Sequence, residues 1–209
     1  NFFKSSLLAD KIIFPEIHNK IQNKKNKVFT GLKYFLIKNE IMKIKKIDQK
    51  KNLAVTFGGS DPYNLIFKIY KILKKIKWNE KTIFYLGSSF SKDQKIKLAN
   101  EIKKYKHFYI SNFDIKKIAN SKLIISSFGT FSYEMAYLKK LSFVVLLRKN
   151  IKIPTNYFFK NTINLGYYRN IKSEMLKNTL YKYLKINFKK NKLYNKKNAA
   201  YEYFKILKN

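Results

Sequence analysis

Residues 53–64 of the 209-residue chain read LAVTFGGSDPYN, which is typical of a buried strand, a glycine turn and the start of a helix. The apolar run Leu53 to Phe57 contains β-branched residues and predicts the strand. The two glycines that follow permit positive φ angles and close backbone approach, and Asp61 with Pro62 has the order of a helix N-cap and a first helical residue. Because a helix that opens after a strand attracts anions, the stretch indicates a phosphate-binding turn. An ordinary strand-to-helix turn is the alternative.

Strand-like and helix-like patterns alternate along the rest of the chain, as expected of βαβ units and a parallel sheet. The predicted strands are residues 11–14, 27–30, 52–57, 82–86, 107–110, 123–126 and 143–147. The predicted helices are residues 63–77, 92–105, 114–120, 131–139 and 156–165, the last stopped by Gly166, followed by a helical tail over residues 173–209. We therefore expect an α/β fold, a Rossmann-like parallel sheet with helices on both faces.

A second glycine turn, SSFGTFSYE at residues 126–134, lies between a predicted strand and a predicted helix. Glu134 falls in the first turns of that helix, where a carboxylate either stabilises the helix end or accepts hydrogen bonds from two ribose hydroxyls. The carboxyl ends of parallel strands meet at one edge of a sheet. We therefore expect both turns to converge on the crevice where open α/β sheets bind ligands.

The composition excludes several kinds of chemistry. The chain has no cysteine, which excludes disulfides, thiolate zinc sites and cysteine nucleophiles, and its two histidines are His18 and His107. We expect no metal and no other cofactor. The sequence shows no secretory leader, and no apolar run approaches the roughly 20 residues that span a bilayer. These features predict a soluble, cytoplasmic protein.

The formal net charge is +34, with 46 basic and 12 acidic residues, but it is spread over every segment. Arg148 and Arg169 are the only arginines, whereas base readout and bidentate phosphate recognition favour arginine over lysine. Abundant Lys, Asn, Ile, Phe and Tyr are what an AT-rich genome produces. We therefore expect no specific nucleic-acid partner and at most a weak attraction to membrane surfaces. A non-catalytic protein that binds polyanions stays open as an alternative.

Three motifs resemble the nucleotide-sugar hydrolases of pseudaminic acid biosynthesis, which are similar in fold to the MurG-like glycosyltransferases of the GT-B type. The motifs are FGGSDP at residues 57–62 followed by Asn64, Gly129-Thr130 with Glu134, and GLKYFL at residues 31–36 followed by Glu40. The resemblance implies two Rossmann-like domains that face each other across a cleft. Residues 1–48 would be the end of the N-terminal domain and the linker, residues 49–170 the nucleotide-sugar-binding domain, and residues 171–209 C-terminal helices that close the sheet.

The resemblance also implies roles for individual residues. Those expected at the diphosphate are Gly58, Gly59, Ser60, Asp61, Ser127, Gly129 and Thr130. Glu134 would hold the ribose, and Asn112 and Phe113 would lie near the uracil. Asn156 would line the cleft, although a helix cap explains it equally well.

In the family, water attacks the anomeric carbon and releases UDP and a free sugar without a required metal. The catalytic histidine of the family lies in a glycine-rich loop that nothing here matches, and neither His18 nor His107 is expected to be the base. We predict that the chain carries the UDP-binding half of a UDP-sugar hydrolase of surface-glycan synthesis, with the base upstream of Asn1. A GT-B glycosyltransferase that uses a UDP-sugar is the alternative, because both enzymes share the donor site.

Overall fold

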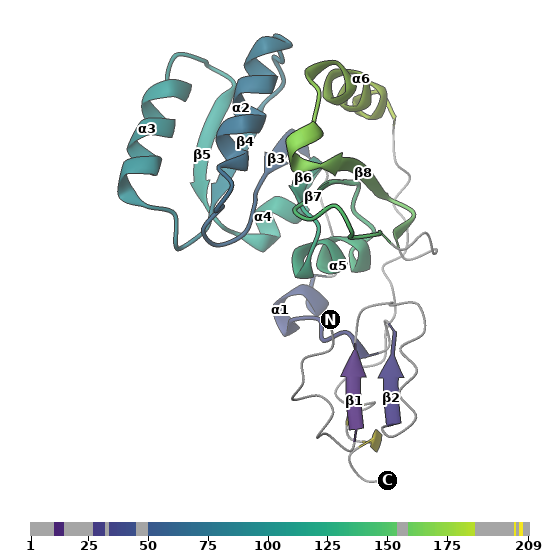
Figure 1. Ribbon diagram of the computed structural model, residues 1–209. Helices are drawn as coiled ribbons and strands as arrows, with labels where there is room; N and C mark the ends of the chain where they lie inside the picture. The colour runs from purple at the N-terminus through teal and green to yellow at the C-terminus, as the bar shows by residue number, and fades with distance from the viewer. Residues whose placement is uncertain are drawn as a thin grey trace. The chain divides into compact units, whose positions relative to one another are not determined.

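The computed structural model describes residues 11–14, 27–31, 34–44, 50–153, 159–186, 203 and 205–206. The chain divides into two compact units (Figure 1). Unit 1 comprises residues 1–43 and 194–209, and unit 2 comprises residues 44–193. The two ends of the chain therefore belong to the same unit.

Unit 1 contains a pair of parallel strands, β1 (Lys11–Phe14) and β2 (Lys27–Thr30), and the short helix α1 (Asn39–Met42). Both strands were predicted and are confirmed. Tyr34 is buried and lies edge-on to the ring of Tyr203, with centroids 6.4 Å apart, and the Tyr203 hydroxyl donates a 3.0 Å hydrogen bond to the Tyr34 carbonyl. Tyr203 therefore packs against Tyr34 within unit 1.

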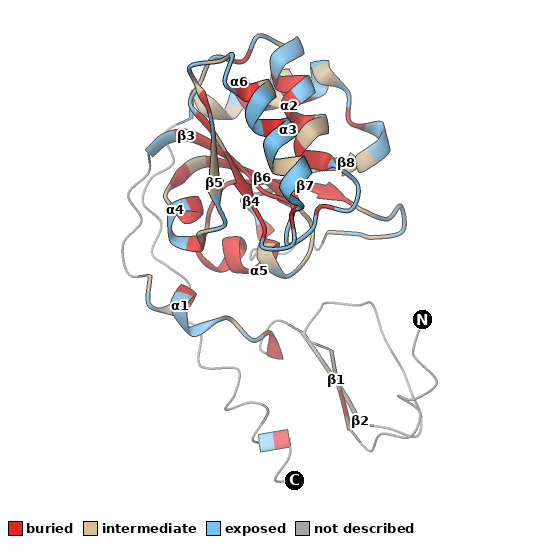
Figure 2. Ribbon diagram, turned by 90° about the vertical axis from the view of Figure 1, so that its left-hand side faces the viewer, coloured by how far each residue is buried: buried red, intermediate tan, exposed pale blue. Residues whose placement is uncertain are grey.

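Unit 2 is built on a six-stranded, fully parallel sheet in the order β5-β4-β3-β6-β7-β8. Its strands are β3 (Lys50–Val55), β4 (Thr82–Leu86), β5 (Phe108–Asn112), β6 (Ser121–Ser127), β7 (Ser142–Leu146) and β8 (Thr162–Tyr167). Helices cover both faces (Figure 2): α2 (Leu65–Lys75), α3 (Lys92–Ile102) and α6 (Ser173–Leu184) lie on one, and α4 (Ile115–Ala119) and α5 (Thr130–Tyr137) on the other. A 3-10 helix, η4 (Tyr168–Asn170), joins β8 to α6. The predicted Rossmann-like α/β fold is confirmed, since this is the strand order of doubly wound sheets.

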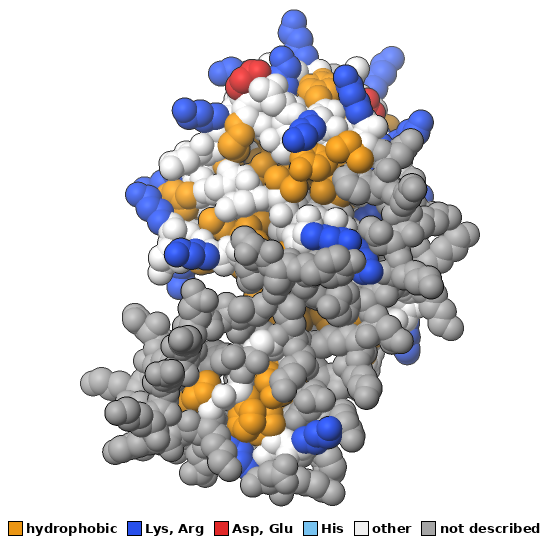
Figure 3. Space-filling view, turned by 90° about the vertical axis from the view of Figure 1, so that its right-hand side faces the viewer, with side chains coloured by type: hydrophobic (Ala, Val, Ile, Leu, Met, Phe, Trp, Pro, Cys, Tyr) orange, Lys and Arg blue, Asp and Glu red, His pale blue; other side chains and the backbone are white. Residues whose placement is uncertain are grey.

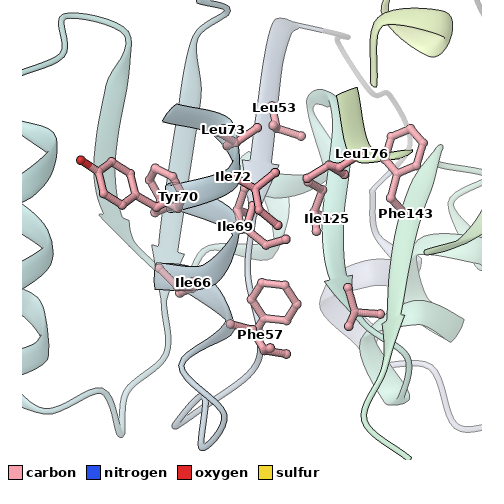
Figure 4. Close-up of a cluster of buried hydrophobic side chains, with 14 of the residues drawn as sticks. Leu53, Phe57, Ile66, Ile69, Tyr70, Ile72, Leu73, Ile125, Phe143 and Leu176 are labelled. Atoms are coloured by element: carbon pink, nitrogen blue, oxygen red, sulfur yellow. The ribbon is translucent and has the colours of Figure 1, made fainter. Parts of the chain in front are cut away.

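The core of unit 2 follows from the burial pattern of its elements. The five residues of β7, SFVVL, are all buried, as expected of a strand covered by helices on both faces. On α2 the buried residues Ile66, Ile69 and Leu73 recur at helical spacing, and they meet Leu53 of β3 and Leu176 of α6 in one cluster (Figure 4). Each such burial contributes about 1.5–3 kcal/mol, so this cluster sets how the helices sit on the sheet.

Strand β8 overturns one prediction. We expected a helix over residues 156–165 that stops at Gly166, but Thr162–Tyr167 form an edge strand that pairs with β7. The register shifts between Val144 and Leu146, and Gly166 has a φ of +85° opposite that shift. Gly166 therefore allows a bulge inside a strand, where we had interpreted it as a helix stop.

The sheet reverses its winding between β3 and β6. From β3 the chain moves through α2 to β4 on one side, and from β6 it moves through α5 to β7 on the other. The connections leave the sheet toward opposite faces, which opens a crevice at the carboxyl edge between the two strands. Both predicted glycine turns lie there.

Candidate functional site

The turn after β3 consists of three exposed residues, Gly58, Gly59 and Ser60, followed by buried Asp61. Gly58 has a φ of +79°, and Asp61 and Asn64 have φ angles of +43° and +51°. Three left-handed residues within seven positions make a compact loop whose glycine backbone faces solvent. The sequence predicted that the glycines of this turn permit positive φ angles, and Gly58 adopts one.

Asp61 caps α2 in a way that differs from our expectation. Its two carboxylate oxygens accept 2.8 Å hydrogen bonds from the backbone N–H groups of Leu65 and Ile66, so the helix begins at Leu65 and not at Pro62 or Tyr63. Burial raises the pKa of this carboxyl, and the two backbone hydrogen bonds oppose that rise. Since the protein's own carboxylate already occupies the first amides of α2, that helix end offers them to no phosphate.

The loop after β4 lies directly against this turn. A Cβ atom at Gly87 would lie 2.3 Å from the carbonyl oxygens of both Gly58 and Gly59, and the Ser89 N–H donates to the Gly59 carbonyl at 3.2 Å. Only glycine allows this approach of two backbones. The position of the Gly58–Gly59 turn therefore depends on Gly87, a residue our sequence reasoning did not select.

The turn after β6 presents unused hydrogen-bond donors. Ser132 holds its shape, because the Ser132 hydroxyl accepts from the Gly129 N–H at 3.3 Å and donates to the Ser127 carbonyl at 3.0 Å. Within the described part of the chain no acceptor engages the N–H groups of Thr130 and Phe131 at the start of α5. These N–H groups and the exposed Thr130 hydroxyl lie at the positive end of a helix, which suits an anion.

Glu134 lies one turn further into α5 and is only 2% exposed. Helical spacing places it behind Thr130 on the same face of the helix. A carboxylate in that position is within reach of hydroxyl groups on a ligand that is bound at the helix start.

The loop after β5 reaches the same region. The Phe113 N–H donates to the Leu86 carbonyl at 2.9 Å, and the Phe113 ring lies edge-on to Phe131, with centroids 6.0 Å apart. In the sheet, β5 and β6 are separated by β4 and β3. The contact between the two phenylalanines therefore brings the predicted uracil-binding loop beside the start of α5.

A cavity of about 430 Å³ joins the loops at the ends of β3, β4 and β5. Its lining residues are Gly58, Gly59, Leu86, Gly87, Ser88, Lys95, Asn112 and Phe113. Four of these were predicted from the sequence as nucleotide contacts. Lys95, from the second turn of α3, was not predicted, because nothing distinguishes it in sequence among 46 basic residues. Ser127, Gly129, Thr130 and Glu134 do not line the cavity but lie at the neighbouring start of α5.

Other candidates lie elsewhere. His107 precedes β5 and packs on Phe108 with ring centroids 4.3 Å apart, at the opposite edge of the sheet from the glycine turns. His18 and Asn156 lie outside the described residues. Among the residues that are described, no three His, Cys, Asp or Glu side chains form a group that could hold a metal ion.

Among the described side chains in Figure 3, the basic ones are scattered and form no single stripe. None of the helices in the described ranges combines the length and apolar character needed to cross a lipid bilayer.

Comparison with known proteins identifies one similar sequence and one similar structure. No protein-family model matches the chain. It is 29% identical over 154 residues to the uncharacterized protein MJ1062 of Methanocaldococcus jannaschii, a match that covers 64% of this chain and 31% of that protein. Its structure is similar, with a TM-score of 0.56 and 18% identity, to the crystal structure of M. jannaschii UDP-GlcNAc 2-epimerase in complex with UDP-GlcNAc and UDP.

The structural match covers 90% of this chain and 56% of the epimerase, so the chain spans about half the length of that enzyme. At this level of identity the similarity establishes the fold alone, a Rossmann-like α/β unit.

Proposed function

We propose that unit 2 binds the UDP part of a UDP-sugar and belongs to an enzyme that processes such sugars. The observation that carries the proposal is the convergence of three loops at the reversal of the sheet: Gly58 and Gly59, the cavity with Asn112 and Phe113, and the donor-rich start of α5. The structurally similar epimerase holds UDP-GlcNAc and UDP, which supports the same class of ligand here.

Each part of UDP has a matching partner in this arrangement. The diphosphate accepts hydrogen bonds from the N–H groups of Thr130 and Phe131 and from the backbone at Gly58, Gly59 and Ser60. Glu134 accepts hydrogen bonds from the ribose hydroxyls. The uracil enters the cavity beside Asn112 and Phe113. Asp61 takes no phosphate in this proposal, because its carboxylate is both negative and engaged with α2.

Among the described residues that line the cavity, Lys95 is the one cationic side chain. An ammonium donates hydrogen bonds and accepts none, so at ring position 4 it suits the carbonyl oxygen of uracil better than the amino group of cytosine. Lys95 therefore favours uridine over cytidine nucleotides in this proposal.

The reaction that we propose is hydrolysis, with unit 2 stabilising the diphosphate as it departs from the anomeric carbon. Donors fixed before the reaction stabilise the developing charge without reorganisation, and the Ser132 hydrogen bonds fix the start of α5 in this way. The structural similarity favours a second candidate, epimerisation of a UDP-sugar. Incubation of UDP-GlcNAc with an enzyme that joins this unit to a domain carrying the catalytic base separates them: hydrolysis yields UDP and free sugar, and epimerisation yields an isomeric UDP-sugar.

Binding is tested by calorimetric titration with UDP, 2′-deoxy-UDP, UMP and phosphate. Glu134→Ala should weaken UDP by about 1.5–3 kcal/mol, the value of a hydrogen bond to a charged group. In this variant the affinities for UDP and 2′-deoxy-UDP should become nearly equal. The deoxy ligand lacks one of the two hydroxyl groups from which Glu134 accepts a hydrogen bond.

Gly129→Ala is the matched variant. A Cβ at Gly129 meets no atom within 4 Å and its φ of 170° is ordinary extended backbone, so the variant should fold normally and still place a methyl group at the proposed diphosphate. A folded chain that does not bind UDP, or a Gly129→Ala variant that binds it unchanged, would contradict the proposal.

A further inference from the structure

A group of exposed and half-buried aromatic and basic side chains lies at the carboxyl edge of unit 2, and none of them lines the cavity. We name it the tyrosine–arginine cluster and define it as Tyr63, Lys149, Tyr167, Tyr168 and Arg169. Tyr63 follows the glycine turn of β3, Lys149 follows β7, and the other three are at the end of β8. No predicted role accounts for these residues.

The position of the arginines first points to this cluster. Of 46 basic residues only two are arginine, so the composition favours lysine wherever a positive charge alone suffices. Leu146 of β7 pairs with Tyr167 of β8, and the two arginines each follow this pair by two residues, Arg148 after β7 and Arg169 after β8. The two arginines are both exposed, and they follow the carboxyl ends of adjacent strands at the same edge of the sheet. Arginine differs from lysine in offering a planar fork of donors to a carboxylate or phosphate.

The cluster is held together before any ligand binds. The Tyr63 and Tyr168 rings lie 4.7 Å apart with their planes tilted by 34°, and Tyr167 lies edge-on to Tyr168 at the same centroid distance. The Lys149 ammonium is 5.8 Å from the centre of the Tyr167 ring, and the Lys68 ammonium of α2 donates to the Tyr168 carbonyl. Contacts from three loops and a helix thus fix the tyrosines. Ligand binding here would require little ordering of side chains.

Arg169 keeps free donors in this arrangement. Its Nε donates to the Tyr168 hydroxyl at 3.0 Å, and its guanidinium lies 5.6 Å from the centre of the same ring. No carboxylate in the described ranges pairs with Arg169. The hydrogen bond that Arg169 donates is the main reason why the pKa of Tyr168 is lowered. The two terminal NH2 groups remain for an anion, and they form the end-on fork that matches a carboxylate.

Tyr63 supplies an open aromatic face. It packs one side of its ring on Tyr168 and is still 46% exposed. An aromatic ring with one open face, beside a fixed guanidinium, presents an apolar surface and an anion-binding fork together. A sugar ring that carries a carboxylate or phosphate has both complementary features, an apolar C–H face and an oxyanion.

We infer that the tyrosine–arginine cluster binds an anionic sugar, stacked on Tyr63 with its acidic group on Arg169. Tyr63 is four residues from Gly59, and four residues span at most about 14 Å, so the sugar of a nucleotide bound at the glycine turn lies within range. The same chemistry suits a separate anionic sugar or glycan. That the ligand is a sugar rests on the proposed function, whereas the anion site on Arg169 does not.

The test compares UDP, UDP-glucose, UDP-glucuronic acid, free glucose and free glucuronic acid by calorimetric titration of the chain. We expect glucuronic acid to bind more tightly than glucose, either as the free sugar or linked to UDP. Arg169→Gln should weaken the acidic ligand by about tenfold and leave UDP unchanged. Arg169→Lys should recover only part of the loss, because lysine keeps the charge and not the fork. Tyr63→Ala should also weaken the binding of the acidic ligand.

Lys172→Gln is the matched control, because Lys172 is exposed, close in sequence and outside the cluster. An equal loss in Lys172→Gln and Arg169→Gln would show general attraction and overturn the inference. If glucuronic acid is preferred over glucose only when linked to UDP, the ligand of the cluster is the sugar of the bound UDP-sugar. If free glucuronic acid is also preferred over free glucose, the ligand is a separate anionic sugar. Equal binding of acidic and neutral sugars in both forms overturns the inference even where UDP binds. A chain that binds no UDP but prefers free glucuronic acid contradicts only the proposed function.

Discussion

Asp61 combines a left-handed backbone, at a φ of +43°, with a carboxylate that caps α2. Asp61→Ala removes both caps and keeps a side chain where φ is positive, and should lower the free energy of unfolding by about 2–4 kcal/mol. Asp61→Gly removes the caps but relieves the backbone, so it should be about 1 kcal/mol more stable than Asp61→Ala. Urea denaturation measures both. Equal stabilities would show that the backbone at this position carries no strain.

Lys140 follows α5 and is 3% exposed, with no hydrogen-bond partner for its ammonium among the described residues. Burial lowers the pKa of Lys140 to about 8, from an ordinary value of 10.5. Between these values the unfolded chain binds more protons than the folded one, so stability rises with pH. Below pH 8 the ammonium is charged in both states and the cost of its burial is fully present.

Lys140→Met should therefore stabilise the protein by about 3 kcal/mol at pH 7, and by only about 1.4 kcal/mol at pH 9.5. Denaturant unfolding at the two pH values measures the difference. Lys104→Met, at an exposed position, should change stability by less than about 0.5 kcal/mol at both. UDP affinity should not change, because Lys140 lies at the amino-terminal edge of the sheet. A stability gain that is independent of pH would contradict a buried ammonium.

Among the secondary-structure elements, the loops after β3 and β4 depend on each other through Gly87. Gly87→Ala forces a methyl group within 2.3 Å of two backbone oxygens and should lower the free energy of unfolding by about 3 kcal/mol. Gly59→Ala is the control for stability, since its Cβ meets only the Ser89 hydroxyl, at 3.8 Å. Thermal unfolding distinguishes them. Similar melting temperatures for both variants would show that the two loops separate without cost.

The strands and helices of unit 2 could be predicted wherever the apolar residues recur with the period of a strand or with that of a helix. Residues 82–86 match the predicted strand in full, and α3 and α4 begin within one residue of the predicted starts. The strand β8 was predicted as a helix because Gly166 is typical of helix ends, and its pairing with β7 across a bulge is a tertiary feature that a local pattern does not contain. The start of α2 was misplaced because Asp61 caps it from outside the helix.

At the scale of the whole chain, the fold was predicted from alternating strand and helix patterns, and two glycine turns placed Gly58 and Gly59 at one edge of the sheet, because parallel strands bring such turns together. Asn112 and Phe113 were named only through the family resemblance. Lys95 and Gly87 were not predicted, since one is hidden by composition and the other acts through a contact between loops. Arg169 was noticed as an arginine, but its place beside Tyr63 and Tyr168 required the pairing of β7 with β8.

The net charge of +34 permits a last prediction, because scattered lysines and a built site respond differently to salt. Exposed charges are screened over about 8 Å at physiological ionic strength, so affinity for a DNA oligonucleotide should fall steeply between 50 and 200 mM salt (about 10³-fold for six or more phosphate contacts). UDP and pyrophosphate should both weaken with salt, but the ratio of their affinities should change little, because Glu134 is buried and Lys95, the cation proposed to contact the uracil, is half-buried. Calorimetry at several salt concentrations measures that ratio. A ratio near one, together with tight DNA binding, would favour the polyanion-binding alternative over a nucleotide site.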